Sequence, residues 1–447
     1  MMKKLVGKTL VAAAVALALS PVLAPQEASA QSLKDVVIQT LESNPNVLSL
    51  IRRKDAADAA IEGAKSGYYP KLDWLWGQGR EQSQNTTTLA TGNSGYVHLW
   101  RKQEGMILNQ MVWDGFGVKS EVDRRQAISD STAHKTYGTA EEIALQAIDA
   151  YLDVVKNREQ VGYARENLQA HQRTFDQVKL RADKGVGRRA DLEQIAARLA
   201  LAQSNQTSAE SKLRDAEITY LKVVGKPPGA LTRPAAPQNI PKSPDEAVKV
   251  GHANHPILKS AQSDVDAAQA QREIARSFYS PRFEVEASYT NNRNIDGVEG
   301  PNRDRMVMVW LKWNLFRGFF ENNRMRETAF QINEASEIAR NTHRQVENAV
   351  RLAYNAHATA RDRLPNLERY VKATDATRVA YNQQFAIGQR TLLDLLNSEN
   401  ELYTARTDLL DAQFIDMSAR YRTLNAMGQL LTSLDVTPPE QAIVKTQ

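Results

Sequence analysis

The chain has 447 residues, of which 24% are charged, and its formal net charge is +5. Cysteine is absent, which excludes disulfides, thiol catalysis, thiolate metal sites and a lipid-modified N-terminal cysteine. The small positive excess is not gathered into the concentrated basic patch that nucleic-acid binding requires, so we expect no nucleic-acid partner.

The N-terminus has the pattern of a secretory signal peptide, which we assign to residues 1–30. Lys3, Lys4 and Lys8 precede an apolar stretch that begins at Leu10, and small residues follow it. The alternative of an N-terminal membrane anchor is disfavoured, because about ten apolar residues cannot cross the ~30 Å hydrocarbon core as a helix. No other stretch approaches the roughly 20 apolar residues of a spanning helix, so we expect an exported protein without helical membrane spans.

The rest of the chain contains two copies of one unit. Residues 44–70 align without a gap with residues 255–281, at an offset of 211 positions. Farther along the offset is 203, because the first copy is eight residues longer between Pro70 and Leu108. A tandem duplication of this kind predicts a repeated structure. Matching residues of the two copies are Asp55 and Asp266, Tyr68 and Tyr279, Gly115 and Gly318, Tyr151 and Tyr354, Gly185 and Gly388, and Gly225 and Gly428.

The two copies set the predicted domain boundaries. The first structural repeat covers residues 31–224, and the second covers residues 245–432. Between them, residues 225–244 are rich in proline, which favours an extended linker along the outside of the structure. Residues 433–447 are expected to form a flexible C-terminal tail.

Each copy is predicted to begin with two helices. The first is short and ends just before Pro45 or Pro256. These prolines lie in the first turn of the second helix, where proline is tolerated. The second helix is expected to run to Gly67 or Ser277, because the Tyr-Pro or Ser-Pro dipeptide that follows disfavours helical backbone.

A β-hairpin is expected in each copy, at about residues 70–113 and 281–316. Apolar and polar residues alternate along the strands, so each strand has one apolar and one wetter face. All six tryptophans lie in or beside these hairpins, as in the aromatic girdles of membrane barrels; a soluble sandwich with buried tryptophans is the alternative. The expected strands are 72–76, 105–113, 282–290 and 305–316, joined by polar loops at 77–97 and 291–304.

A very long helix is predicted after each hairpin, at about residues 118–184 and 320–387. Roughly 66 residues at 1.5 Å each reach ~100 Å, which no globular domain needs. A returning helix is expected at about 190–224 and 391–432. These segments are rich in Ala, Leu, Gln, Arg and Glu at helical spacing, which is typical of extended coiled coils.

Four strands cannot close into a membrane barrel, whose smallest single-chain examples have eight. Open sheet edges are not tolerated in lipid, so membrane strands of this kind require several chains to share one barrel. A closed ring of chains also places their long helices side by side in a cylinder. The pattern therefore predicts an α+β membrane protein with a shared transmembrane β-barrel and a tunnel of coiled helices, and it leaves the number of chains open.

Several motifs resemble the TolC outer-membrane efflux family, over residues 32–432. They are WDGFG at 113–117, its counterpart LFRGF at 315–319, and IGQRTLLDLLNSENELY at 387–403. The resemblance implies a homotrimer with one barrel in the outer membrane and a helical barrel that extends into the periplasm and is closed at its inner end. The stretch 292–318 is more similar to the type I secretion branch, which includes exporters of large adhesins.

The family pattern places the turns between long and returning helices at the closed periplasmic tip. Carried over by position, Arg390 is a gate residue, Asp191 is its acidic partner in the neighbouring coil, and Asp394 is a ring carboxylate. An arginine–carboxylate bond there holds a coil and remains breakable. The alternative for Asp191 and Asp394 is to cap or flank helix starts, where the helix dipole favours acidic residues. Tip residues expected to contact an adaptor protein are Gly185, Gly187, Arg188, Arg189 and Gly388.

Two positions depart from the family pattern. Asn397 stands where a second constricting aspartate is common, and Phe385 stands where a tyrosine often hydrogen-bonds across the coils. The resemblance therefore implies a weaker latch and a constriction with one ring carboxylate per chain rather than two.

No motif for catalysis or cofactor binding is found. GVG at 185–187 is a turn, nothing resembles a P-loop, and no serine lies in a nucleophile-elbow pattern. His252 and His255 have the spacing of a metal pair, but His255 lies just before a helical proline, so a helix end explains it better. We expect no enzyme activity, no cofactor and no metal site.

The favoured function is that of an outer-membrane channel-tunnel subunit, a passive exit path for type I secretion of proteins. Its expected partners are further copies in a homotrimer, outer-membrane lipid, a periplasmic adaptor protein and an inner-membrane ABC transporter. One alternative keeps the fold and exports drugs or metal ions with a proton-driven pump. Another, of a different class, is a soluble periplasmic coiled-coil adaptor.

Overall fold

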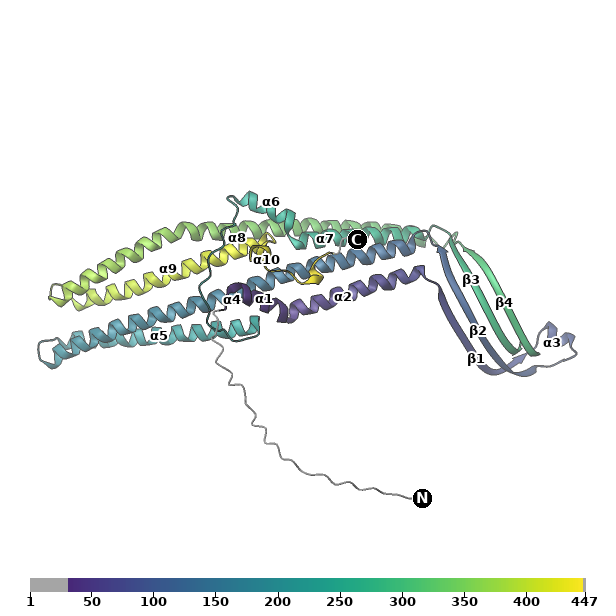
Figure 1. The fold of residues 1–447 in the computed structure, drawn as a ribbon, viewed down its shortest axis with the longest axis horizontal. Helices are drawn as coiled ribbons and strands as arrows, with labels where there is room; N and C mark the ends of the chain where they lie inside the picture. The colour runs from purple at the N-terminus through teal and green to yellow at the C-terminus, as the bar shows by residue number, and fades with distance from the viewer. Residues whose placement is uncertain (1–30, 445–447) are drawn as a thin grey trace, which may run out of the picture.

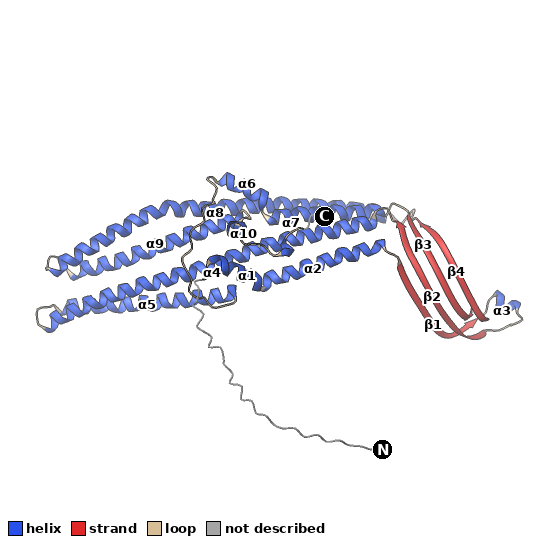
Figure 2. Cartoon of the chain, in the orientation of Figure 1, coloured by secondary structure: helices blue, strands red, loops and turns tan. Residues whose placement is uncertain are grey.

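The computed structural model describes residues 31–444, which form a long molecule with helices along most of its length and a sheet at one end (Figure 1). The signal peptide predicted for residues 1–30 lies outside the described residues. Figure 2 shows that the strands are confined to a single sheet, which has four strands in the order β1-β2-β3-β4. The predicted α+β class is confirmed.

Apart from the short helices α3 and α10, the two halves of the chain contain the same helices and strands in the same order. Both long helices, α4 and α8, have 67 residues and are therefore about 100 Å long. The first half consists of α1 (Leu33–Ser43), α2 (Pro45–Lys65), β1 (Lys71–Ser83), the short α3 (Thr86–Ala90), β2 (Val97–Trp113), α4 (Gly117–Asp183) and α5 (Arg189–Val224). The second half consists of α6 (Pro244–Asn254), α7 (Pro256–Ser277), β3 (Arg282–Ile295), β4 (Val298–Lys312), α8 (Phe320–Ala386) and α9 (Leu392–Ala426), followed by the short α10 (Leu430–Ser433).

Local sequence explains where the helices begin. The Asn44 side chain accepts a hydrogen bond from the Asn46 N–H at 3.0 Å and caps α2. In the second half, His255 Nδ1 accepts from the Ile257 N–H at 3.3 Å and caps α7 in the same way. A capping side chain satisfies an N–H that has no partner inside the helix. The helix-end explanation of His255 is therefore confirmed.

The chain turns from sheet to long helix through a glycine followed by a phenylalanine. Gly115 and Phe116 have φ values of 71° and 68°, and Gly318 and Phe319 have 59° and 64°. Positive φ is uncommon for a residue other than glycine, so these turns store strain that the surrounding packing must hold. A Cβ atom on Gly115 would lie 2.4 Å from the Ser280 Cβ, which leaves room for glycine alone. The WDGFG and LFRGF motifs are these two turns.

The strands are longer than the alternation of side chains predicts. The prediction of a loop at 291–304 is therefore wrong. Pairing between β3 and β4 continues from Arg282↔Lys312 as far as Ile295↔Val298. Asp296 and Gly297 have φ values of 53° and 76°, the two positive values of a two-residue type I′ hairpin turn. Polar side chains do not prevent pairing, because the ladder is made by backbone groups. β4 also ends at Lys312 and not at residue 316.

The other expected loop, 77–97, begins as strand and also contains a short helix. β1 continues to Ser83, and the connection to β2 contains α3. Asn85 Nδ2 donates to the Asp296 carbonyl at 2.7 Å, which joins this connection to the turn of the other hairpin. Thr88, which belongs to α3 in this connection, is buried. The extra length of the first copy therefore lies in this connection, at the end of the sheet far from the helices (Figure 1).

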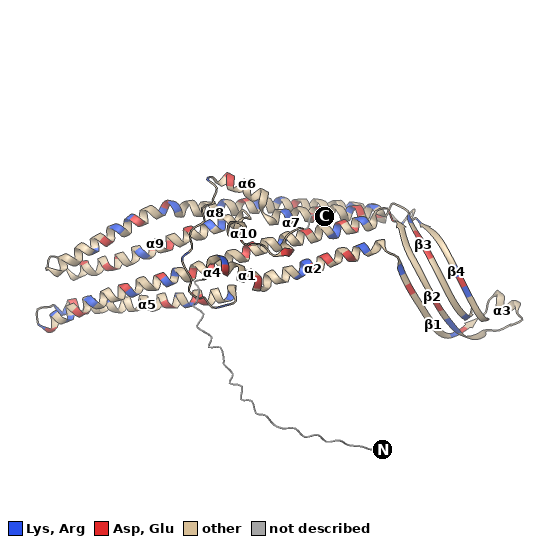
Figure 3. Cartoon of the chain, in the orientation of Figure 1, with Lys and Arg blue, Asp and Glu red and all other residues tan. Residues whose placement is uncertain are grey.

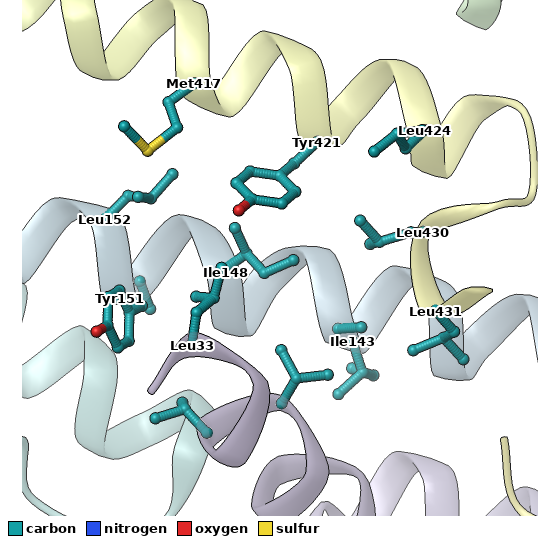
Figure 4. Close-up of a cluster of buried hydrophobic side chains, with 14 of the residues drawn as sticks. Leu33, Ile143, Ile148, Tyr151, Leu152, Met417, Tyr421, Leu424, Leu430 and Leu431 are labelled. Carbon is teal, nitrogen blue, oxygen red and sulfur yellow. The ribbon is translucent and has the colours of Figure 1, made fainter. Parts of the chain in front are cut away.

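The main hydrophobic core lies in the middle of the helical part, around α4. Figure 4 shows side chains of α4 packed between α1 on one side and α9 with α10 on the other. Burial of this set explains why the shorter helices gather at mid-length of α4. The labelled core residues are Leu33, Ile143, Ile148, Tyr151, Leu152, Met417, Tyr421, Leu424, Leu430 and Leu431.

The proline-rich segment between the halves crosses the helices and is fastened by repeat-related tyrosines. The buried Tyr151 hydroxyl lies 3.0 Å from the Gln31 carbonyl and 2.7 Å from the Thr232 carbonyl, and it accepts from the Thr232 N–H at 3.0 Å. Its counterpart in the second half, Tyr354, donates to the Lys242 carbonyl at 2.7 Å. The segment is therefore held at two points, Thr232 and Lys242, by the same residue of each copy.

Both long helices carry a helix-weakening residue at the same repeat position. Pro365 lies inside α8, where it has no N–H to donate to the carbonyl four residues earlier. Its counterpart at the offset of 203 is Gly162 in α4, and glycine costs about 1 kcal/mol relative to alanine in a helix.

The predicted ends of α9 and of the tail require correction. α9 ends at Ala426 rather than at residue 432, because Gly428 has a φ of 68°. A Cβ there would lie 2.8 Å from the His255 Cα. Beyond α10 the chain packs back on the helices, with Val436 and Ala442 only 5% and 4% exposed. Up to residue 444, the prediction of a flexible tail is therefore wrong.

A buried carboxylate fastens this C-terminal segment to α4. Glu141 is 2% exposed and accepts hydrogen bonds from the Leu430 and Leu431 N–H groups, both at 3.0 Å. Burial raises the pKa of Glu141 to about 7, although the two backbone hydrogen bonds act in the opposite direction. The ionised form thus costs free energy in the folded state.

Replacing Glu141 with glutamine is expected to remove one pH dependence of stability. Between about pH 4.5 and 7 the folded state holds a proton on Glu141 that the unfolded state has lost, so stability falls as the pH rises through this window, by up to about 3 kcal/mol. Urea unfolding of the purified protein from pH 4.5 to 8 measures this loss. Glu141→Gln should flatten the curve relative to the wild type, whereas Glu142→Gln, at the exposed neighbour, should not. Parallel curves for all three proteins would contradict the assignment.

Candidate functional site: the helical tips and the faces of the sheet

The α4–α5 and α8–α9 hairpins end in tight turns that glycine makes possible. Gly185 and Gly388, at the same repeat position, have φ values of 77° and 80°. The Gly187 N–H donates to the Arg181 carbonyl at 3.0 Å, and a Cβ on Gly187 would lie 2.8 Å from the Ala182 nitrogen. The structure thus places the predicted tip glycines in the two turns.

Arg390 interacts within its own hairpin. Its guanidinium lies 4.4 Å from the centre of the Tyr381 ring, and its Nε donates to Gln384 Oε1 at 3.0 Å. Its carboxylate partner is Asp394, at 3.8 Å. The side chain of Asp191 makes no hydrogen bond or ion pair within residues 31–444. The chain therefore brings Arg390 to Asp394, and the pairing with Asp191 stays a prediction.

Asp394 also caps the start of α9. The Asp394 N–H donates to Thr391 Oγ1 at 3.2 Å, while the Thr391 N–H and hydroxyl donate to Asp394 Oδ2 at 3.4 and 2.9 Å. This reciprocal capping box accounts for the residue at the third helical position. Asp191 lies in the first turn of α5, after the N-cap residue Arg188, whose side chain makes no cap. The helix-start alternative fits both carboxylates, because Asp394 caps α9 and Asp191 flanks the start of α5.

Asn397 and Phe385, the two departures from the family pattern, join the two hairpins of the chain. Asn397 Oδ1 accepts from Arg198 on α5 at 3.1 Å. The Arg181 guanidinium of α4 lies over the Phe385 ring, 5.5 Å from its centre. A small apolar cluster surrounds this contact. Arg181 and Arg198 were not singled out from the sequence, which offers no signal for contacts between residues about 200 positions apart.

The apolar cluster at the tips is separate from the main core. Its buried members come from three helices, and Phe385 packs against them from α8. It is the apolar contact that keeps the two hairpins together near their ends, because the main core lies around the middle of α4. The buried members are Val178, Ile195, Leu392 and Leu396, and Phe175, Leu192 and Phe385 are partly buried against them.

The two tips differ in charge. Around the first turn, residues 179–191 hold five basic and two acidic side chains, whereas residues 381–394 around the second hold Arg390 and Asp394. Acidic and basic residues are otherwise mixed along the helices (Figure 3). Among the residues that the structure describes, the side chains of Lys179, Lys184, Arg188 and Arg189 take part in no ion pair, so the first tip presents net positive charge to solvent.

Strand register divides the sheet into an apolar face and a polar face. Directly paired residues share a face, and alternate residues of a strand lie on opposite faces. The apolar face consists of Leu72, Trp74, Trp76, Met106, Leu108, Phe283, Val285, Ala287, Tyr289, Val307, Val309 and Leu311. Several of them are well exposed, for example Val307 at 75% and Leu72 at 66%, so within the described chain nothing covers this face. Such exposure indicates an interaction surface.

The polar face carries hydrogen-bonded charged residues. Lys312 donates to Glu284 at 2.6 Å, and Trp310 Nε1 donates to Glu286 at 3.1 Å. At the end nearest the helices, aromatic side chains border the sheet; Phe116, Trp313, Phe316 and Phe319 are exposed, and Trp113 is half-buried. The outer edges of β1 and β4 pair with no other strand among residues 31–444.

No described helix combines the length and the apolar character that crossing a membrane demands. Among the described residues, no group of three or more His, Asp or Glu side chains is arranged to hold a metal ion. His252 lies against His343, with ring centres 5.2 Å apart, and His255 is engaged in capping.

Comparison with known proteins gives a consistent result. A sequence model of the outer membrane efflux protein family matches residues 36–226 and 251–431. Outer membrane efflux protein BepC of Brucella suis is 26% identical over 424 residues, which cover 95% of this chain and 91% of BepC. The alkaline protease secretion protein AprF of Pseudomonas aeruginosa is 23% identical over 416 residues, which cover 88% of this chain and 84% of AprF. The solved outer membrane protein VceC of Vibrio cholerae has the same fold, with a TM-score of 0.76 at 15% identity over 89% of this chain and 96% of that chain.

Replacing Phe385 with alanine is expected to loosen the contact between the two hairpins. The substitution removes the ring beneath Arg181 and opens the apolar cluster, so local opening of the tip should become roughly tenfold more frequent. Hydrogen exchange of peptides covering 385–396, followed by mass spectrometry, measures this opening. Leu180→Ala, at a residue 55% exposed near the same tip, is the matched control. Equal exchange in both variants would show that the cluster does not hold the tips.

Proposed function

The chain belongs to the outer membrane efflux protein family, and from this premise we propose that it is one subunit of a homotrimeric channel-tunnel for type I secretion of proteins. It is an outer-membrane protein that extends into the periplasm. The observation that carries the proposal is the four-stranded sheet, which has one apolar face and, within residues 31–444, two unpaired edges.

The sheet explains why several copies assemble. In lipid, backbone groups at an open edge have no water to bind, so β1 of one copy must pair with β4 of the next until the ring closes. Three copies then supply three times four strands to one barrel, whose apolar face meets lipid and whose polar face, with Glu284 and Glu286, lines the lumen.

The helices explain the tunnel. Each sheet edge is tied to its helices by short turns, so a closed ring of sheets places α4, α5, α8 and α9 of all copies side by side. Their length of about 100 Å takes the conduit deep into the periplasm. The chain itself supplies no energy in this proposal, so export depends on an inner-membrane ABC transporter and a periplasmic adaptor.

The tips are the proposed gate and the proposed adaptor contact. Arg390 holds its coil closed through Asp191 of a neighbouring hairpin, and Asp394 contributes one carboxylate per chain to the constriction. The unpaired positive charge near Arg188 and Arg189 supports contact with an acidic segment of the adaptor. Gly185, Gly187 and Gly388 shape the turns that the adaptor meets, and docking exchanges these contacts to open the tunnel.

The name of one relative favours proteins as the exported cargo. AprF is named for the secretion of alkaline protease, and it aligns with 88% of this chain. BepC, however, is named as an efflux protein, which keeps small-molecule export as the second candidate. Because both kinds of protein share this fold, the cargo is decided by the partners that the tips bind.

Deleting the chain is expected to remove one or a few large proteins from the secreted and surface-attached fraction. Mass spectrometry of that fraction, compared with the parent strain and with a complemented strain, identifies the cargo. An unchanged secreted fraction together with new sensitivity to antibiotics and dyes would refute protein export and establish small-molecule efflux. A protein recovered in the soluble periplasm would refute the channel itself.

Substitutions of the gate pair are expected to enlarge the conducting pathway. In planar lipid bilayers, Arg390→Ala and Asp191→Asn should each raise the single-channel conductance several-fold. The double variant should add little to either, because both remove one interaction. Arg344→Ala, an exposed arginine elsewhere on α8, serves as the control and should leave conductance unchanged. Additive effects, or no effect of Asp191→Asn, would contradict the pairing.

A further inference from the structure

A row of basic residues borders the apolar face of the sheet at the end far from the helices. Each of the four strands contributes to this row, which we call the basic belt. Along this face of β4, Arg305 follows Val307 directly, whereas on β1 the polar Gln78 lies between Trp76 and Arg80. The belt consists of Arg80, Lys102, Arg293, Arg303 and Arg305.

The register places all five cations on the apolar face. Arg305 pairs with Tyr289, which pairs in turn with Met106 of the apolar face. Arg303 is two residues from Arg305 and therefore points the same way. Arg293, four residues beyond Tyr289, pairs with Lys102. On β1, Arg80 pairs with Trp100, two residues before Lys102.

The belt has no carboxylate partners. All five side chains are exposed, and within residues 31–444 none of them takes part in an ion pair. Arg303 Nε instead donates to the neutral Asn291 Oδ1 at 3.1 Å, and Arg305 lies over the Tyr289 ring, 5.6 Å from its centre. Arg101, on the opposite face of the same strand, shows the contrast, because its guanidinium is 2.6 Å from Glu81.

Two belt residues carry like charges at directly paired positions, so their side chains repel one another. Lys102 and Arg293 lie directly opposite across β2 and β3. Like charges in that position destabilise a sheet. Glu104 is the acidic residue nearest to them on this face, so five positive charges stand against one negative charge. An anion from outside the chain that lies between Lys102 and Arg293 would relieve this repulsion.

A hollow in the apolar face begins at the belt. It has a volume of about 540 Å³ and is lined mainly by apolar side chains, with Arg305 at the belt end. A lipid whose headgroup phosphate lies on the belt would therefore have an acyl chain beside a shallow apolar hollow. The lining on this face consists of Leu72, Met106, Leu108, Ala287, Tyr289, Arg305 and Val307.

We propose that the basic belt binds the phosphate groups of an anionic lipid in the outer leaflet, with an acyl chain of that lipid in the hollow. Because the helices extend into the periplasm, the belt lies at the level of the outer headgroups. The inference rests on the proposed function only in taking the apolar face as the lipid-facing side of the barrel. Arg and Lys at this depth bind phosphate by charge-assisted hydrogen bonds.

The test uses the full-length protein purified in detergent and native mass spectrometry with lipid A as the probe. The wild type should retain bisphosphorylated lipid A and should lose most of this binding when the lipid is dephosphorylated. Lys102→Gln combined with Arg293→Gln should weaken binding about 30-fold, or roughly fivefold for each cation removed. Lipid A should also raise the unfolding temperature of the wild type and not that of the double variant.

Lys71→Gln combined with Arg282→Gln is the matched control. These residues are also exposed and unpaired in the described chain, but they lie on the polar face at the other end of the sheet. Equal retention by wild type and belt variant, equal loss in the control, or displacement of the lipid by millimolar inorganic phosphate would overturn the proposal. The same spectra give the oligomer mass, so loss of lipid binding by an intact trimer is distinguished from loss of the trimer itself.

Discussion

The hydrogen bonds missing at the two edges of the sheet constrain everything else in this molecule. A strand pairs on both sides or leaves a row of N–H and C=O groups open, and β1 and β4 are open on one side in the described chain. Water can satisfy such a row, and lipid cannot. If the apolar face lies in lipid, a single chain leaves these edge groups without partners, so several chains are needed to close the sheet. Closing the sheet also fixes the positions of the long helices, because the short turns at Gly115–Phe116 and Gly318–Phe319 join strand directly to helix.

The duplication supplies the same scaffold twice, and the two copies differ at both ends of the molecule. Tyr151 and Tyr354 fasten the connecting segment in equivalent ways. The outer ends of the hairpins differ, with a helical connection in one copy and a two-residue turn in the other. The periplasmic tips differ as well, since positive charge gathers around Arg188 and not around Arg390. In a trimer, tips of two chemical kinds would alternate around the ring, so a partner that senses charge would find three equivalent positions rather than six.

The sequence predicts the long helices to within one or two residues, because 3.6-residue periodicity over such lengths has no competing explanation. The sequence-based prediction of the strand ends is wrong where backbone pairing extends beyond the alternating side-chain pattern. Residues 291–304 are mostly polar and still form strand on both sides of the turn. The Asp-Gly dipeptide at 296–297 was the available signal for that hairpin. Gly428 likewise marked the end of α9, as its counterpart Gly225 marks the end of α5. The contact of Phe385 with the other hairpin had no signal, since such pairings depend on how the coils cross rather than on local pattern.

Gly162 and Pro365 give the long helices a common level of weakness. Each lies 21 residues before the end of its helix at Asp183 or Ala386, which is about 32 Å from the tip. Below that level each hairpin can act as a lever arm pivoting on one weakened turn, while the main core above stays packed. A change of direction of roughly 10° at the pivot displaces the end of such an arm by about 6 Å. Because the two weakened turns lie at the same height, both hairpins of a chain can bend at one level, and in the proposed tunnel this bending would change the width at the tips without moving the sheet.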